Sequence, residues 1–186
     1  MPITYVTTYA CPLGRLTLES DGRRLTRVRL PGEAPPPAAR RPRGGATADA
    51  DARVNDPQPF AEAIAQLDEY FAGARRKFDL PLAPQGTPFQ LKVWRELRKV
   101  PYGKTITYAT LARRAGNEAA CRAVGAANGR NPIPLVIPCH RVVGANQRLT
   151  GFFGGVALKA KLLAIEGLVL TDEKPSPESR VLASGT

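Results

Sequence analysis

Three prolines interrupt one short apolar run, and this pattern limits the fold of the chain more than any other. The apolar residues Ile133, Leu135, Val136 and Ile137 are interspersed with Pro132, Pro134 and Pro138. Proline cannot donate a backbone hydrogen bond and is disfavoured inside helices. The run therefore predicts a short, buried, extended segment, which ends at Cys139, where an ordered strand meets a turn.

Cys139 is followed by His140, the only histidine of the chain, and by Arg141. A thiol held beside an imidazole and a cation is partly ionised, and the thiolate is the nucleophilic form. The alternative is that Cys139 is a small buried apolar residue, as most free cysteines are. Neighbouring side chains on a strand point to opposite faces, so we expect a water between thiol and imidazole. A carboxylate on the other imidazole nitrogen would fix the tautomer, and Glu166 is the best candidate.

The positive charge of the chain is concentrated in one half. Residues 86–167 hold 13 Lys or Arg against three acids, whereas residues 1–85 hold 12 against 10, and the whole chain has a net charge of +11. A polyanion is the natural partner of such a half, and nucleic acid is the commonest polyanion. A surface kept basic for solubility is the alternative.

The remaining composition excludes several classes of protein. No apolar run approaches the ~20 residues of a membrane span, and the N-terminus lacks a signal peptide, so we expect a cytoplasmic protein without a membrane partner. The cysteines, Cys11, Cys121 and Cys139, are odd in number and widely spaced. This pattern favours reduced thiols over a disulfide framework or a cysteine-rich metal site. We expect no metal and no cofactor.

The first half, residues 1–85, is predicted to be an N-terminal α/β domain. Apolar and polar residues alternate over 2–30 between turn signals, which predicts three antiparallel strands. Residues 31–59 are rich in Pro, Gly, Ala and Arg and predict a flexible loop, either solvated or touching DNA backbone. Phe60, Ile64, Leu67 and Phe71 then form the apolar stripe of a helix that packs on the strands and ends near Gly73.

The second half, residues 86–170, is predicted to be mostly helical. Thr87 and Pro88 start a helix with an N-cap and a proline at its first position. Two short helices follow, over 106–115 and 118–128, joined through Gly116 and Asn117. They resemble a helix-turn-helix, although a general helical hairpin is the alternative. We expect a hairpin over 142–150, a glycine-hinged loop over 151–155, a last helix over 156–166 and a disordered tail over 171–186.

Three motifs together resemble the O6-alkylguanine-DNA alkyltransferases. They are Pro138-Cys-His-Arg-Val142 after the Asn-Pro-rich run, Thr150-Gly-Phe-Phe-Gly-Gly155, and Leu163-Ala-Ile-Glu-Gly167. The match covers residues 86–167, and the preceding half is similar to the less constrained N-terminal domain of that family. The resemblance implies an α+β fold: a ribonuclease H-like domain with a three-stranded antiparallel sheet and a packed helix, then a winged-helix-like domain with a helix-turn-helix.

The resemblance also implies a function. The family members are single-turnover methylated-DNA–protein-cysteine methyltransferases that repair DNA by direct reversal. They flip the damaged nucleotide out of the duplex and move the alkyl group from O6-alkylguanine, and from O4-alkylthymine, irreversibly to a cysteine. The partner would be double-stranded DNA that contains O6-alkylguanine, bound by a monomer, with cooperativity on DNA left open.

Roles of individual residues follow from the same comparison. Cys139 would be the alkyl acceptor, His140 its water-mediated base, Glu166 the partner of His140, and Asn131 the brace of the turn. The expected DNA contacts are Tyr108, Arg122 as the inserted arginine finger, Gly125, Ala126 and Arg130. The expected substrate pocket is formed by Tyr108, Cys139, Val142, Phe152 and Phe153. Phe153 is bulkier than the residue usual in the family, which leaves the accepted alkyl size open.

Three other functions have to be weighed against repair. A non-catalytic sensor of alkylated guanine would lack the cysteine, and a plain helix-turn-helix regulator has no need of the Cys-His-Arg turn or of Glu166. A cysteine hydrolase would need an oxyanion site, which nothing in the sequence resembles. Cys139 therefore favours the repair function.

Overall fold

The N-terminal half is built on a small sheet. In the computed structural model, which describes residues 3–33, 53–171 and 180–182, the strands are β1 (Thr4–Cys11), β2 (Gly14–Ser20), β3 (Leu25–Arg29) and β4 (Arg53–Asn55). Their order is β3-β2-β1-β4, with antiparallel pairing except between β1 and β4, which are parallel. The three predicted strands are confirmed, and β4 is an addition.

Strand β4 corrects one detail of the prediction. It lies within residues 31–59, for which the sequence predicts a flexible loop; residues 34–52 of that range are outside the described residues. The short Arg53–Asn55 segment carries no apolar period because all three of its residues are exposed. Its backbone pairs with the free edge of β1, from Thr4 to Val6, and this pairing leaves no pattern in the side chains.

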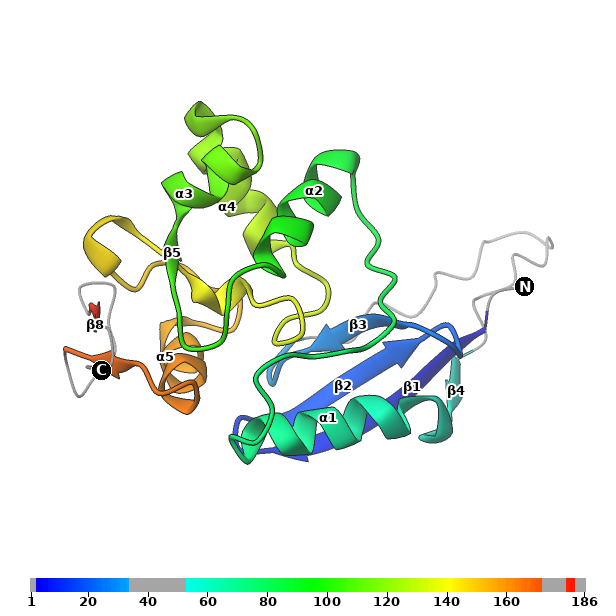
Figure 1. The fold of residues 1–186 in the computed structure, drawn as a ribbon. Coiled ribbons are helices and arrows are strands. Elements are labelled where there is room, and N and C mark those ends of the chain that lie inside the picture. The colour runs from blue at the N-terminus through cyan, green and yellow to red at the C-terminus, as the bar shows by residue number, and fades with distance from the viewer. Residues whose placement is uncertain (1–2, 34–52, 172–179, 183–186) are drawn as a thin grey trace.

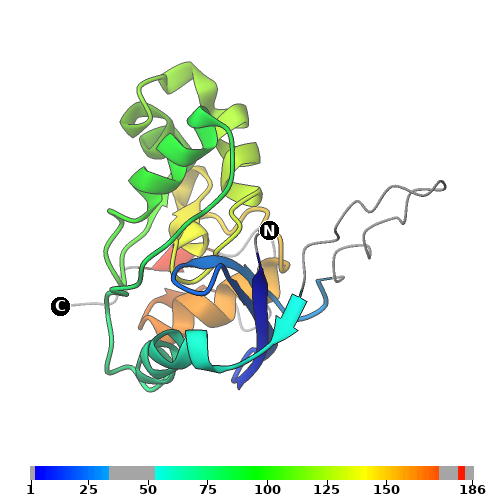
Figure 2. The same cartoon turned by 90° about the vertical axis from the view of Figure 1, so that its right-hand side faces the viewer.

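One helix covers the sheet, as predicted. A short 3-10 turn, η1 (Gln58–Phe60), leads into α1 (Ala61–Phe71). Phe60, Leu67 and Tyr70 are almost fully buried, and they pack with Leu16 and Leu18 of β2 in the main hydrophobic core. Burial of each such large side chain stabilises the fold by roughly 1.5–3 kcal/mol. Figure 1 and Figure 2 show α1 lying along the sheet, with the helices of residues 88–129 gathered at the other end of the molecule and the helix of residues 156–165 close to the sheet.

The C-terminal half begins with α2 (Pro88–Leu97), and its predicted start is confirmed. The Thr87 hydroxyl accepts from the backbone N–H of Gln90 and the Gln90 side chain accepts from that of Thr87, which completes a capping box. The next pair of helices is shorter than predicted: α3 (Tyr108–Arg114) and α4 (Cys121–Gly129), with the 3-10 turn η2 (Glu118–Ala120) between them. Residues 106–107, expected in the first helix, form strand β5 (Ile106–Thr107).

The proline-interrupted segment is buried as predicted, but it is not a strand. The N–H of Ile137 donates to the carbonyl of Ile133 at 2.9 Å, and Leu135 has a φ of 70°, so the chain turns back on itself. Pro132 and Pro134 have no N–H to pair in a ladder, which favours a compact turn over a strand. Cys139 is consequently the first residue of a 3-10 turn, η3 (Cys139–Arg141).

The predicted hairpin over 142–150 is wrong. Strand β6 (Val142–Val143) pairs in parallel with β5, and the 3-10 turn η4 (Ala145–Gln147) follows. The N–H of Gly144 does donate to the carbonyl of Arg148 at 2.8 Å, which closes a local turn, but no antiparallel ladder within 142–150 grows from it. Val142 and Val143 pair with β5, a strand distant in sequence, and the local sequence does not indicate this partner.

Residues 180–182 lie against the C-terminal half of the molecule. Helix α5 (Val156–Ile165) is followed by β7 (Val169–Leu170), which pairs antiparallel with β8 (Val181–Leu182). Val181 is buried in a second apolar cluster with Val143, Leu149 and Leu163. The prediction of a disordered tail over 171–186 is therefore wrong for β8; residues 172–179 and 183–186 lie outside the described residues.

Backbone contacts join the two halves. The N–H of Val28 in β3 donates to the carbonyl of Pro132 at 2.9 Å, so the proline-rich turn rests on the N-terminal sheet. The main core also runs through both halves, from Leu16 to Ile133. The described helices include none with the length and apolarity that crossing a bilayer requires.

Candidate active site

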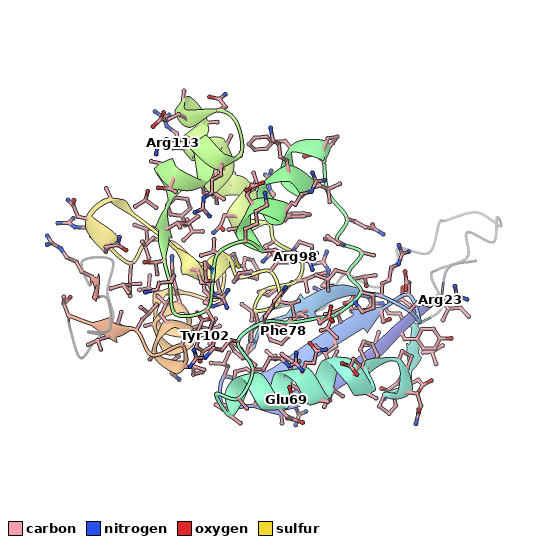
Figure 3. All side chains as sticks on the ribbon, in the orientation of Figure 1. Arg23, Glu69, Phe78, Arg98, Tyr102 and Arg113 are labelled. Atoms are coloured by element: carbon pink, nitrogen blue, oxygen red, sulfur yellow. The ribbon has the colours of Figure 1, made fainter. Side chains whose placement is uncertain are left out.

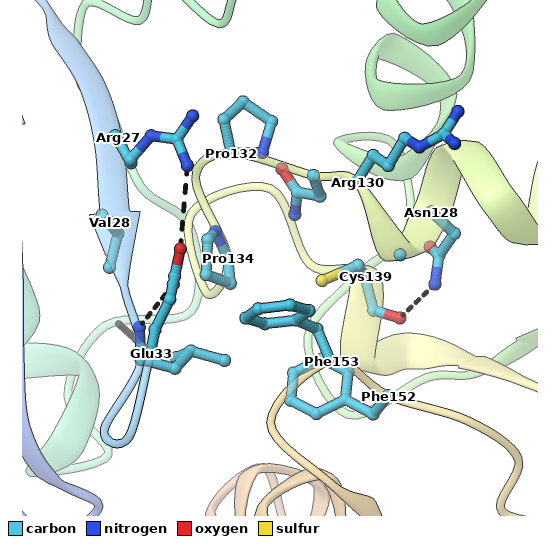
Figure 4. A pocket seen from close by; sticks show the side chains of 13 residues that line it. Arg27, Val28, Glu33, Asn128, Arg130, Pro132, Pro134, Cys139, Phe152 and Phe153 are labelled. Carbon is cyan, nitrogen blue, oxygen red and sulfur yellow. Dashed lines mark hydrogen bonds and ion pairs between the residues drawn. The ribbon is translucent and has the colours of Figure 1, made fainter. Parts of the chain in front are cut away.

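Cys139 lies at the base of a cavity, and a hydrogen-bonded turn fixes its position. Its side chain is 4% exposed. The amide of Asn131 clamps the turn, because its Nδ2 donates to the carbonyl of Ile137 at 2.7 Å and its Oδ1 accepts from the N–H of Ile133 at 3.1 Å. Nδ2 of Asn128 donates to the carbonyl of Cys139 itself at 3.4 Å. In Figure 4 the sulfur points into the open space of the cavity.

The thiol of Cys139 is not ionised by its surroundings alone. Burial raises its pKa, while the Asn131 side chain, the charge of Lys159 and nearby backbone N–H groups oppose that rise without cancelling it. Because the thiolate is the reactive form of a cysteine, nucleophilic chemistry at this thiol would need a base to take its proton.

His140, the next residue, carries a neutral imidazole that can accept a proton. It is fully buried, and its Nε2 lies 2.7 Å from Oε1 of Glu166. Burial lowers the pKa of the imidazole, although Glu166 counteracts this, so the ring is neutral at neutral pH. A carboxylate only accepts, so Nε2 carries the hydrogen and Nδ1 is left with its lone pair. Nδ1 has no partner among the described residues.

Glu166, the C-cap residue of α5, is held as a carboxylate by several donors. It accepts from His140, from Nε and Nη2 of Arg141 at 2.9 Å, from the hydroxyl of Tyr70 at 2.9 Å and from the N–H of Gly103 at 3.0 Å. Burial alone would raise its pKa, but His140 and Arg141 outweigh that effect and lower it to about 2. Glu166 thus stays charged and fixes the tautomer of His140.

The positions of two cations differ from the sequence interpretation. The Arg141 guanidinium, expected beside the thiol, is turned to Glu166 and to the carbonyl of Val100, 2.6 Å from Nη1. The charge near Cys139 instead belongs to Lys159 of α5, which sequence reasoning missed. Lys159 is fully buried and donates to the carbonyls of Val142 and Thr150. Burial lowers its pKa to about 8, and Cys139 partly offsets this.

The cavity has a volume of about 330 Å³ and is shared by the two halves of the molecule. Of the five predicted pocket residues, Cys139, Phe152 and Phe153 line it, and Phe153 is 65% exposed. Val142 is fully buried and does not line it, and its carbonyl is occupied by Lys159. Tyr108 also lies outside the lining, with its hydroxyl 3.3 Å from the carbonyl of Gly151. The opposite wall consists of β3 and the residues after it, including Arg27 and Glu33, which the sequence did not indicate.

Helix α4 carries Arg122, Gly125 and Ala126 of the predicted DNA contacts, Arg130 directly follows it, and Tyr108 belongs to α3. Arg122, Ala126 and Arg130 are exposed and recur at every fourth position, so they share one side of the helix. Gly125 is half-buried beside the ring of Tyr108. Arg130 also lines the cavity of Cys139, so this face continues to the mouth of the cavity.

A metal site is not formed by the residues described. No group of three or more His, Cys, Asp or Glu side chains is gathered closely enough among them to hold an ion. Cys11 and Cys121 are each half-buried and free.

Comparison with known proteins gives the family. The description "6-O-methylguanine DNA methyltransferase, DNA binding domain" matches residues 88–168, and "6-O-methylguanine DNA methyltransferase, ribonuclease-like domain" matches residues 4–84. The chain belongs to the 6-O-methylguanine DNA methyltransferase family. The family, the enzyme class and the α+β fold predicted from the sequence are thereby confirmed.

Individual methyltransferases match over most of their length. A constitutive methylated-DNA–protein-cysteine methyltransferase of Bacillus subtilis is 44% identical over 88% of this chain and 96% of its own. A methylated-DNA–protein-cysteine methyltransferase of Mycolicibacterium paratuberculosis is 44% identical over 83% of this chain and 87% of its own. The crystal structure of Mycobacterium tuberculosis OGT in complex with DNA has a TM-score of 0.76 at 40% identity and covers 87% of this chain and 92% of that one.

Proposed function

We propose that this methyltransferase repairs DNA by moving the alkyl group of O6-alkylguanine to the sulfur of Cys139. The observation that carries the proposal is the position of Cys139, at the base of a cavity and next in sequence to a neutral histidine held by a charged glutamate. Membership of the family supplies the reaction class.

The proton and electron pairs can be followed through the side chains. The thiol proton of Cys139 passes through a water to Nδ1 of His140, and Glu166 stabilises the imidazolium that forms. The thiolate attacks the alkyl carbon, a C–S bond forms, and the C–O bond breaks with its electron pair on O6. The departing guanine anion takes up one proton from water, the imidazolium of His140 gives its proton back to the water, and both guanine and the neutral imidazole are restored.

The product limits the protein to one turnover. A thioether has no easy reverse or hydrolytic route, and the other two cysteines, Cys11 and Cys121, are not among the residues that line the cavity. Each molecule therefore repairs one lesion and is consumed.

The cavity requires the damaged nucleotide to leave the duplex. Cys139 is only 4% exposed. Its sulfur therefore cannot reach O6 of a guanine that is stacked in the duplex. Flipping costs a few kcal/mol, which an inserted side chain can offset by filling the gap. Arg122 is the residue proposed to fill it, with Tyr108 crowding the phosphate of the target nucleotide. Gly125 and Ala126 allow the close approach of α4, and Arg130 guides the nucleotide to the cavity.

The same geometry suits a second lesion. O4-alkylthymine presents an alkyl carbon on an exocyclic oxygen, as O6-alkylguanine does, and it is the smaller base. We propose it as a further substrate, bound by a monomer of the protein on double-stranded DNA.

A titration tests the proposed reaction. Increasing amounts of protein are added to a fixed amount of duplex that contains O6-methylguanine, and restored guanine is counted. Restoration should rise linearly and stop at one per protein; Cys139→Ser should restore none, whereas Cys121→Ser should match the wild type. Restoration of several lesions by each protein would overturn the proposal.

A further inference from the structure

A second and larger cavity lies behind the active-site turn. It has a volume of about 760 Å³ and is open to solvent between the segment after α1, the end of α2 and the loop that follows α2. Figure 3 shows three residues of this region, Phe78, Arg98 and Tyr102, in the middle of the molecule and far from Arg113 on the helix-turn-helix. We call this cavity the basic cleft.

The basic cleft is separate from the site of Cys139. The proline-rich turn forms a wall between the two, because Pro134 and Cys139 line the first cavity, whereas Leu135 and Pro138 line the basic cleft. None of its lining residues belongs to α3 or α4. The cleft is therefore part of neither the alkyl-acceptor cavity nor the surface of the helix-turn-helix.

Five side chains on its rim carry positive charge, and none of the lining residues is acidic. They are Arg76, Lys77, Arg95, Arg98 and Lys99, all exposed. Only Lys99 has an acidic partner within the described residues, Glu96 at 2.6 Å. Arg141 also borders the cleft but is committed to Glu166. Like charges that converge in this way repel one another unless an anion lies between them.

Part of the framework of the cleft is held by a hydrogen bond and a ring contact, which favours a preformed site. Tyr102 is fixed by a hydrogen bond from its hydroxyl to the carbonyl of Ile165 at 2.8 Å. The guanidinium of Arg76 lies over the ring of Tyr102, 5.9 Å from the ring centroid. At this distance a cation and an aromatic ring attract each other. Arg95 and Arg98, three positions apart near the end of α2, lie on the same side of that helix. The cations thus approach the cleft from two segments distant in sequence.

We propose that the basic cleft binds a run of phosphates, those of a nucleic-acid segment other than the one held by the helix-turn-helix. A single phosphate would fill only part of the volume and would meet only some of the cations, whereas consecutive phosphates can meet them all. The same chemistry would accept free polyphosphate, so the test includes both. This inference does not rest on the chemistry of Cys139.

Calorimetric titration with sodium tripolyphosphate at low salt tests the proposal. The double variant Arg76→Gln, Arg98→Gln removes a cation from each side of the cleft. The matched control, Arg23→Gln with Lys161→Gln, removes the same charge from exposed positions outside the lining. We expect the first variant to bind at least tenfold more weakly and the control to stay within twofold of the wild type. Thermal unfolding checks that both variants are folded.

A lesion-free single-stranded oligonucleotide identifies the source of the phosphates. If it displaces tripolyphosphate, and the Arg76, Arg98 variant binds it more weakly than the control does, the ligand is nucleic acid. If the variant binds tripolyphosphate more weakly but binds the oligonucleotide as the control does, free polyphosphate is the ligand. That result would support the phosphate site and contradict its assignment to nucleic acid. Equal affinity of the variant and the control for tripolyphosphate would overturn the proposal, as would failure of the wild type to bind it.

Discussion

The hydroxyl of Tyr70 donates a hydrogen bond of 2.9 Å to Oε1 of Glu166, the same oxygen that lies 2.7 Å from His140. Tyr70 belongs to α1 in the N-terminal half, whereas Glu166 ends the last helix of the C-terminal half. Burial, and then the charge of Glu166, raise the pKa of Tyr70, so the phenol stays a donor. The N-terminal half thus contributes directly to the hydrogen bonds that hold His140.

Replacing Tyr70 by Phe should remove this bond with little change in volume. We expect a loss of about 1.5–3 kcal/mol in the free energy of unfolding, as for other hydrogen bonds to a charged group. Alkyl transfer should slow only severalfold, because Arg141 and Gly103 still hold Glu166. Urea unfolding and single-turnover kinetics measure both. Tyr5→Phe is the matched control, and equal stability of the two variants would contradict the account.

Glu166→Gln should affect the reaction much more. A neutral amide cannot balance Arg141, and it can donate to Nε2 of His140, which would move the proton to Nδ1 and remove the base. We expect transfer to slow by about 10²-fold or more and the free energy of unfolding to fall by about 3–5 kcal/mol.

The control for this variant is Glu69→Gln, which breaks the more exposed pair with Arg75 and should cost less than about 1 kcal/mol. Affinity for lesion-containing DNA, measured by fluorescence anisotropy, should be kept in Glu166→Gln. Transfer within threefold of the wild type would show that the carboxylate does not orient the base.

Lys159 should make stability depend on pH. Its pKa is lowered to about 8 in the folded protein, against about 10.4 in an unfolded chain. Below pH 8 both states are protonated, and the full cost of the buried charge is present. Above pH 8 the unfolded chain binds more protons than the folded protein, so stability rises with pH. Between pH 8 and 9.5 the gain should reach at most about 2 kcal/mol.

The comparison that isolates this effect is the slope of unfolding free energy against pH. Lys159→Met should lose the rise, while Lys161→Met, at an exposed position, should keep it. The tyrosines are present in all three proteins, so their titration cancels. Parallel curves for the wild type and Lys159→Met would rule out a depressed pKa for this lysine.

The end of the chain should contribute to stability through Val181. This side chain is 4% exposed in the second apolar cluster, so Val181→Ala should cost about 1–2 kcal/mol. Val169→Ala, at a residue that is 55% exposed, should stay within about 0.5 kcal/mol of the wild type. Thermal unfolding of the two variants provides the comparison, and equal midpoints would mean that β8 is not docked.

Local patterns in the sequence predicted much of the fold. Alternation predicted β1 to β3, the apolar stripe from Phe60 predicted α1, and Thr87 with Pro88 predicted the start of α2. Each of these signals depends on neighbouring residues alone. Two of the errors fall where a distant partner decides, because β4 pairs with β1 and β6 pairs with β5. The backbone pairing that makes these strands leaves no period in their side chains.

Only some residues of the candidate site could be predicted from the sequence. Cys139, His140 and Asn131 are close in sequence, and Glu166 was one of few acids available, so the set could be assembled without a structure. Tyr70 could not be predicted, because it reaches the site from another part of the fold. Lys159 did carry a signal: it is three and four positions before Leu162 and Leu163, which places a cation on the apolar side of a helix.

Intact-mass spectrometry tests the central claim most directly. The protein is incubated with excess duplex containing O6-methylguanine, weighed, and then digested for peptide mapping. The account predicts that each molecule gains the mass of one methyl group in place of a hydrogen, entirely on Cys139. An unmodified Cys139 after the lesion has been repaired, or a methyl group found on Cys11 or Cys121, would contradict it.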